Sequence, residues 1–213
     1  MKTESLIDTL STGARPVQRY AIERRLLFAA LVGLTVAAAI VLPLFRVRPD
    51  IVTAVQLPMF WVKELVVVAI AAVAVFAAAR LSRPGARTGA LPVVVAAPFV
   101  LLWTLAAWRL IGAAPNERVQ LLLGRTWQTC IPEMVVFALP AFVATFWAMR
   151  GLAPTRLVLA GAVSGLMAGA IGATVYAVHC PEMELPFIAT WYVAAIAVHA
   201  LIGALLGPRL LRW

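Results

Sequence analysis

Residues 157–178 read LVLAGAVSGLMAGAIGATVYAV, a run that contains no charged side chain. A helix needs about 20 residues to cross the hydrocarbon core of a bilayer, so this run predicts one membrane-spanning helix. Within it glycine recurs every four residues, at Gly161, Gly165 and Gly169. Small residues at this spacing let a second helix approach closely. The stretch therefore predicts a spanning helix that packs against other helices.

Five further apolar runs of similar length occur along the chain, and none alternates as the strands of a membrane barrel do. Backbone polar groups in lipid must find their partners within the segment, so these runs also predict helices. The predicted fold class is an all-α integral membrane protein with six transmembrane helices. The predicted spans are 26–45, 58–79, 90–108, 131–149, 157–178 and 187–207, within a transmembrane domain of residues 26–213 that follows an N-terminal segment of residues 1–25.

The overall composition agrees with a membrane protein. Hydrophobic residues make up 63% of the 213-residue chain and charged residues 13%, against roughly 45–50% and about 25% in soluble domains. The net charge of +9 comes from basic residues that are scattered singly. Binding to nucleic acid needs a clustered basic patch, so direct nucleic-acid binding is not expected.

The basic residues indicate the orientation in the membrane, because Lys and Arg concentrate in cytoplasmic loops. They are frequent in the N-terminal segment, in the loops after the second and fourth spans, and in the C-terminal tail. The residues on this side are Lys2, Arg15, Arg19, Arg24, Arg25, Arg80, Arg83, Arg87, Arg150, Arg156, Arg209 and Arg212. Both termini are therefore expected to be cytoplasmic.

The last span repeats the small-residue spacing at Gly203 and Gly207. We expect these five glycines to serve helix packing and not to take part in chemistry. They are Gly161, Gly165, Gly169, Gly203 and Gly207. The last span also contains His199, which is expected to be a buried, hydrogen-bonded histidine.

Three further ionisable residues lie in the spans. Lys63 and Glu64 lie near the outer end of their span, where long side chains can reach the membrane surface. Glu133 is expected in the first turn of its helix, where the helix dipole favours an acidic side chain, and a proton or ion site is the alternative. A transporter usually has more polar residues at the middle of the membrane, so that class is a weaker alternative.

The two cysteines flank consecutive spans. Cys130 directly precedes the fourth span and Cys180 directly follows the fifth, so opposite helix directions place both thiols on the outer face. A structural disulfide and a reversible redox or metal-sensing pair are both open interpretations. A catalytic dithiol is less favoured, because the Cys-x-x-Cys spacing is missing. With His179, the cysteines could form a soft-metal site, and no other cofactor is expected.

The N-terminal segment contains a short amphipathic pattern. Residues 3–12 read TESLIDTLST, in which Leu6, Ile7 and Leu10 form an apolar stripe on a helix. A helix this short is marginal alone, so it either lies on the membrane surface or binds in a partner's groove. Helices that lie on membranes usually have basic polar faces, and the two acidic side chains here favour a protein partner.

Several motifs are familiar in combination. They are VYAVHCPE at 175–182, PFIATWY at 186–192, GPRLLRW at 207–213, RPDIVTAVQLPMFWVKE at 48–64, RLSRPGAR at 80–87 and LIDTLSTGARPVQR at 6–19. Together they resemble the NrsF-type family along nearly the whole chain. Members of this family are negative regulators of an extracytoplasmic-function sigma factor.

The resemblance implies an anti-sigma factor of the bacterial inner membrane, acting in transcription regulation under stress, and not an enzyme. Cys180 matches through HCPE and Cys130 through CIPEM, which implies that this pair senses oxidant or a thiophilic metal ion. The N-terminus would hold the sigma factor, with the lipid bilayer around the helices. The residues expected to bind the sigma factor are Leu6, Ile7, Leu10, Arg15, Pro16, Val17 and Arg19. The alternatives are a membrane thiol oxidoreductase and a small transporter or channel.

Overall fold

The computed structural model describes residues 3–12, 20–83, 85 and 88–212. Every regular element in these ranges is helical, and no strand occurs among them. Six helical units are long and apolar enough to cross a membrane. The predicted all-α architecture with six long apolar helices is therefore confirmed.

The first and last long units each contain one turn of π-helix, η1 and η2, and the remaining elements are α-helices. In chain order the elements are α1 (Thr3–Thr12), α2 (Ala21–Val36), η1 (Ala37–Val41), α3 (Leu42–Phe45), α4 (Ile51–Ala54), α5 (Pro58–Leu81), α6 (Leu91–Ile111), α7 (Arg118–Leu123), α8 (Trp127–Arg150), α9 (Leu157–His179), α10 (Leu185–Phe187), η2 (Ile188–Tyr192) and α11 (Val193–Leu210).

Helix α8 begins earlier than the sequence predicts, at Trp127 rather than at residue 131. Cys130 therefore lies inside the first turn of α8 and does not precede the helix. Glu133 lies in the second turn, so the expectation of a first-turn acidic residue is wrong. Cys180 directly follows α9, as the sequence predicts.

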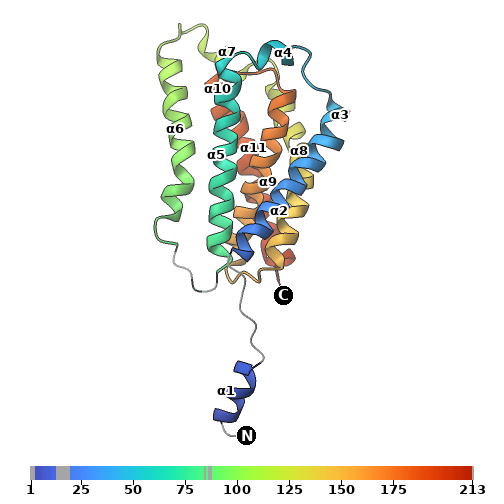
Figure 1. Ribbon diagram of the computed structural model, residues 1–213. Coiled ribbons are helices and arrows are strands. Elements are labelled where there is room, and N and C mark those ends of the chain that lie inside the picture. The colour runs from blue at the N-terminus through green and yellow to red at the C-terminus, as the bar shows by residue number, and fades with distance from the viewer. Residues whose placement is uncertain (1–2, 13–19, 84, 86–87, 213) are drawn as a thin grey trace.

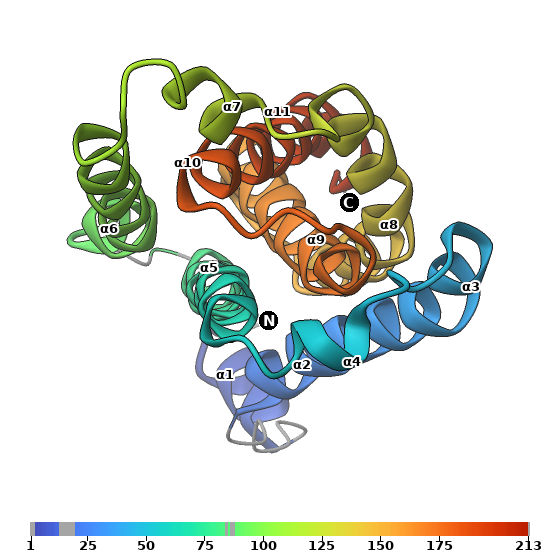
Figure 2. The same cartoon turned by 90° about the horizontal axis from the view of Figure 1, so that it is seen from above.

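Helix α9 is the centre of the bundle. Figure 2 shows α5, α8 and α11 around it, and these three helices together with α2 make contacts with it. In the most apolar stretch of α9, 72% of the residues are buried inside the bundle. The corresponding share in α6, which lies at the edge of the bundle, is 17%. The glycine-rich run at 157–178 is thus the core of the fold, because its small side chains let neighbouring helices approach closely.

The contact between α9 and α11 depends on the predicted glycines. A Cβ added to Gly161 would meet the carbonyl oxygen of Gly203, and a Cβ added to Gly203 would meet the carbonyl oxygen of Gly161. Gly165, Gly169 and Gly207 also face the opposite helix closely enough that an added Cβ would crowd it. The two backbones are therefore in direct contact along this stripe.

The two ends of the bundle differ in what they carry. The start of α2 and the end of α11 lie at one end, which we call the terminal end (Figure 1). The short helices α4, α7 and α10 lie at the opposite end, close to the start of α8 and the end of α9 (Figure 1). We call this second end the cysteine end, since Cys130 and Cys180 belong to it.

Candidate functional site: a buried thiol pair at one end of the bundle

The two cysteines are neighbours in the folded chain. Both thiols are free and both residues are fully buried, and they interact electrostatically with each other. Thr126, the residue before α8, joins them: its carbonyl accepts the backbone N–H of Cys130 at 3.0 Å. Its hydroxyl oxygen lies 4.0 Å from Sγ of Cys180. The packing of α8 against α9 therefore brings the predicted sensor residues into one site.

Cys130 has a soft and acidic environment. Its Sγ lies 3.9 Å from Sδ of Met134, one turn along α8, and it borders the Tyr176 hydroxyl. That hydroxyl donates a hydrogen bond of 3.2 Å to Oε2 of Glu133. The carboxylate of Glu133 on α8 is thus held by Tyr176 of α9, next to the thiol pair.

Lys63 is fully buried and points into the site from α5. Its Nζ donates hydrogen bonds to the carbonyl oxygens of Ala177, Cys180 and Glu182, at 3.0, 3.0 and 3.1 Å. Carbonyls at the C-terminal end of a helix have no partner within the helix, and a cation there is favoured by the helix dipole. Lys63 thus caps α9, and of the two places that the sequence left open for it, the bundle interior and the membrane surface, it lies in the interior.

Arg48 approaches the same segment from the loop before α4. Its Nη1 donates to the Cys180 carbonyl at 3.4 Å, and its backbone N–H donates to the carbonyl of Val178 at 3.3 Å. Its Nε and Nη2 donate to the two carboxylate oxygens of Asp50, each at 2.7 Å. This paired hydrogen bonding raises the pKa of Arg48 and lowers the pKa of Asp50 from their usual values.

Tyr192 closes the site from η2. The residue is 1% exposed, its hydroxyl has no hydrogen-bond partner among the described residues, and it interacts electrostatically with Cys180. Nζ of Lys63 lies 6.0 Å from the centre of its ring. The ring also packs against Tyr176, with centroids 5.6 Å apart. A buried, unpaired hydroxyl beside a thiol is a potential hydrogen-bond donor to a thiolate.

The predicted metal site has no support in the described residues. Nδ1 of His179 lies 2.7 Å from the carbonyl oxygen of Arg46, and Nε2 lies 3.5 Å from Oε2 of Glu133. Both ring nitrogens thus already face oxygen atoms. No group of three or more His, Cys, Asp or Glu side chains that could hold a metal ion occurs in the part of the chain that the structure describes.

The N-terminal segment is described in part. Helix α1 confirms the short helix predicted at 3–12, and it exposes Leu6 by 42% and Ile7 by 59%. The other predicted partner-binding positions lie outside the described residues or have side chains outside them. These are Leu10, Arg15, Pro16, Val17 and Arg19.

At the terminal end, the start of α2 is tied to neighbouring helices. Nε of Arg25 donates to the carbonyl of Ala148 on α8 at 3.0 Å, and its guanidinium lies 4.8 Å from the centre of the Trp147 ring. Glu23 pairs with Arg83, just after α5, at 2.6 Å. Helix α8 thus carries Cys130 at one end and the acceptor for Arg25 at the other.

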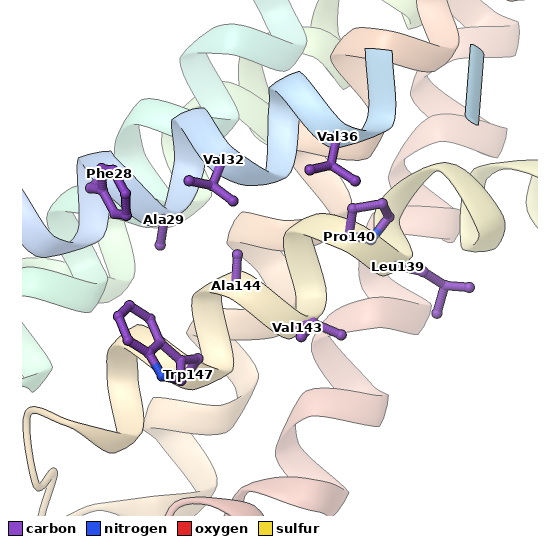
Figure 3. Close-up of a pocket in the computed structure, with 9 residues that line it drawn as sticks. All are labelled: Phe28, Ala29, Val32, Val36, Leu139, Pro140, Val143, Ala144 and Trp147. Carbon is purple, nitrogen blue, oxygen red and sulfur yellow. The ribbon is translucent and has the colours of Figure 1, made fainter. Parts of the chain in front are cut away.

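Two other features of the bundle are not part of the thiol site. His199 is buried, and its Nδ1 lies 2.7 Å from the carbonyl of Ala195, which confirms the expected hydrogen-bonded histidine. A groove of about 540 Å³ lies between α2 and α8 (Figure 3). Its lining side chains offer no nucleophile, acid or base, and they are Phe28, Ala29, Val32, Val36, Leu139, Pro140, Val143, Ala144 and Trp147.

The sequence did not predict a place in the thiol site for Lys63, Arg48 and Tyr192, nor for Thr126, Met134 and Tyr176. Lys63 shares one face of its helix with Val67 and Ile70, at i+4 and i+7, and all three are buried. The sequence alone does not identify this face as the buried one, because the helix is apolar on every side.

Comparisons with known proteins agree along the full chain. Residues 10–213 match the family NrsF, described as "Negative regulator of sigma F". A protein of Azospira oryzae, "Probable anti-sigma-F factor NrsF", is 44% identical over the full length of both chains. A protein of Caulobacter vibrioides, "Anti-sigma-F factor NrsF", is 38% identical over the full length of both chains. No solved structure matches. The chain therefore belongs to the NrsF family of negative regulators of sigma F.

Proposed function

We propose that this protein is an anti-sigma factor that holds an extracytoplasmic-function sigma factor at the bacterial inner membrane. Its relatives are named as anti-sigma factors, which are regulators and not enzymes. The sigma factor binds residues 1–25, with the exposed Leu6 and Ile7 of α1 in an apolar groove of the partner. Both termini face the cytoplasm, and the cysteine end faces outward.

The observation that carries the sensing role is the convergence of Cys130 and Cys180 at the end of the bundle opposite α2's first turn. In the proposed reaction an oxidant of the small-molecule disulfide class takes up two electrons. The two thiols lose two protons and form one S–S bond. A thiophilic metal ion bound by the two thiols alone is the alternative stimulus, since His179 is engaged elsewhere.

Helix α8 offers a route from the thiols to the N-terminal segment. A bond between the cysteines holds their sulfurs about 2.05 Å apart and so ties the first turn of α8 covalently to the end of α9. The other end of α8 holds Arg25 through Ala148, next to the segment that binds the sigma factor. A bias of a few kcal/mol on that segment is sufficient to release most of the bound partner.

Partner binding is tested by co-purification from bacterial membranes with the detergent-solubilised full chain. We expect the sigma factor to be recovered with the full chain and lost with a variant lacking residues 1–20. Leu6→Glu with Ile7→Glu removes the apolar surface and should also lose the partner. Glu4→Gln, on the same helix, is the matched control and should retain it. Recovery of the sigma factor with the truncated chain would contradict the proposed binding site.

Sensing is tested by adding a small-molecule disulfide to the preformed complex. Wild type should release the sigma factor, whereas Cys130→Ser should bind it and retain it under the same treatment. Thr129→Ser, an exposed neighbour on α8, is the control and should behave as wild type. Normal release from Cys130→Ser would remove the sensor role from the pair.

A further inference from the structure

The two cysteines differ in their electrostatic surroundings, and this difference assigns them separate roles in the sensing reaction proposed above. Lys63 is the main cause. Its Nζ has three carbonyl acceptors, at 3.0, 3.0 and 3.1 Å, which matches the three N–H donors of an ammonium group. One of these acceptors is the carbonyl of Cys180 itself. A buried cation is therefore hydrogen-bonded to the backbone of Cys180, and it also interacts electrostatically with the Cys180 side chain.

Arg48, which is paired with Asp50, is a second cation at the backbone of Cys180. Its Nη1 lies 3.4 Å from the same carbonyl oxygen, and its side chain is 5% exposed. Charges that are buried are screened far less by salt and water than charges at a surface. Both cations interact electrostatically with the Cys180 side chain.

Hydroxyl groups complete the surroundings of Cys180. The Tyr192 hydroxyl is buried, borders Cys180 and has no hydrogen-bond partner among the residues described. The Thr126 hydroxyl lies 4.0 Å from the sulfur. Both can donate a hydrogen bond to a thiolate, and donors and cations are the groups that favour a thiolate over a thiol.

The surroundings of Cys130 differ in charge: its electrostatic neighbours are Cys180, Glu133 and Glu182, and the Tyr176 hydroxyl beside it donates its hydrogen bond to Glu133. The sulfur of Cys130 faces the uncharged thioether of Met134. A negative charge nearby disfavours a second one. Around the thiol pair, the titratable and charged groups are Lys63 from α5, Arg48 and Asp50 from the loop before α4, Glu133 from α8, Tyr176 from α9, Glu182 from the loop after α9, and Tyr192 from η2.

We infer that Cys180 is the thiol that ionises and attacks the oxidant, that Lys63, Arg48 and Tyr192 stabilise its thiolate, and that Cys130 is the second, resolving thiol. With a small-molecule disulfide, the Cys180 thiolate forms a bond to one sulfur of the reagent and displaces the other half as a thiolate. Cys130 then loses its proton and attacks the Cys180 sulfur. The S–S bond between the cysteines forms, and the second half of the reagent leaves as a thiolate.

The order of reaction is tested by alkylation of the reduced, detergent-solubilised full chain with iodoacetamide, followed by mass spectrometry of each cysteine. Cys130→Ser reports Cys180 alone, and Cys180→Ser reports Cys130 alone. The rate is measured from pH 6 to 10. Because both thiols are buried, the access of iodoacetamide limits the maximal alkylation rate of each cysteine. The pH at which the rate is half-maximal reports instead the charge around the sulfur. We expect Cys180 to have its midpoint at lower pH than Cys130.

Lys63→Met in the Cys130→Ser background should move the Cys180 curve to higher pH and lower its rate near pH 7 by roughly tenfold or more. Lys63→Arg in the same background keeps the charge, and its curve should stay close to that of the parent Cys130→Ser variant. Arg48→Gln should shift the curve in the same direction as Lys63→Met, and it decides the matter if Lys63→Met does not fold. Arg46→Gln removes a nearby exposed arginine and is the control without effect.

Equal midpoints for the two cysteines, or a lower midpoint for Cys130, would overturn the assignment. So would Lys63→Met or Arg48→Gln curves that coincide with the curve of the parent variant. The alkylation needs no sigma factor, so its result is independent of partner binding. Failure of sigma-factor release with the predicted thiol order intact would instead count against the proposed function.

Discussion

The close contact between α9 and α11 gives a quantitative prediction for Gly165→Ala. The added Cβ would meet the His199 carbonyl oxygen, and it would lie 2.7 Å from the carbonyl carbon of His199 and 3.1 Å from Cα of Ala200. Carbon atoms pack best at about 3.5–4.0 Å, so the helices must separate by close to an ångström. Overpacking of this kind costs about 1–3 kcal/mol, and alanine regains about 0.5–1 kcal/mol through its helix propensity. From the middle of each range, the expected net loss is roughly 1 kcal/mol.

The free energy of unfolding is measured by titration with a denaturing detergent. Gly112→Ala is the matched control, because the nearest atom to its added Cβ lies at 3.7 Å, an ordinary contact distance. This control should change the free energy of unfolding by less than about 0.5 kcal/mol. If Gly165→Ala were as stable as Gly112→Ala, the α9–α11 backbone contact described above would be wrong.

Three further predictions concern residues outside the thiol pair. Arg25→Gln loses the bond to the Ala148 carbonyl and should lower the free energy of unfolding by about 1–2 kcal/mol in the same titration; an unchanged value would contradict the contact. The Arg48 guanidinium holds the pKa of Asp50 below its usual value, so this pair stabilises the fold above about pH 4 and its contribution is lost as the pH falls through the lowered pKa. The melting temperature of Asp50→Asn should therefore fall less than that of wild type as the pH drops below about 4. Identical profiles of melting temperature against pH for the two proteins would refute this. Gly124→Ala should lower the melting temperature, because Gly124 has a φ of +58° that disfavours a side chain, and an unchanged value would contradict that geometry.

The long helices were predictable from the sequence because length and hydropathy alone define a membrane span. The meeting of Cys130 and Cys180 at one end follows from the same reasoning, since consecutive spans run in opposite directions. The glycines of α9 and α11 were predictable from their four-residue spacing, which marks a face where backbones approach. These features depend on local sequence or on the simple alternation of spans.

The partners of Lys63 could not be predicted in the same way. A membrane helix is apolar on all sides, so the sequence does not indicate which face turns inward, and Lys63 could equally have reached the surface. Its acceptors Ala177, Cys180 and Glu182 belong to the end of another helix and the loop that follows it. Their convergence on Lys63 depends on how α5 packs against α9, which is a tertiary property.

The link between the thiols and sigma-factor binding is tested most directly by measuring the sigma factor bound to one preparation of the full chain before and after treatment with a small-molecule disulfide. We expect the sigma factor to co-purify with the reduced protein and most of it to be released when Cys130 and Cys180 form a bond. Reduction should restore binding. A sigma factor that stays bound although mass spectrometry shows the Cys130–Cys180 bond would contradict the link between the thiols and the N-terminal segment.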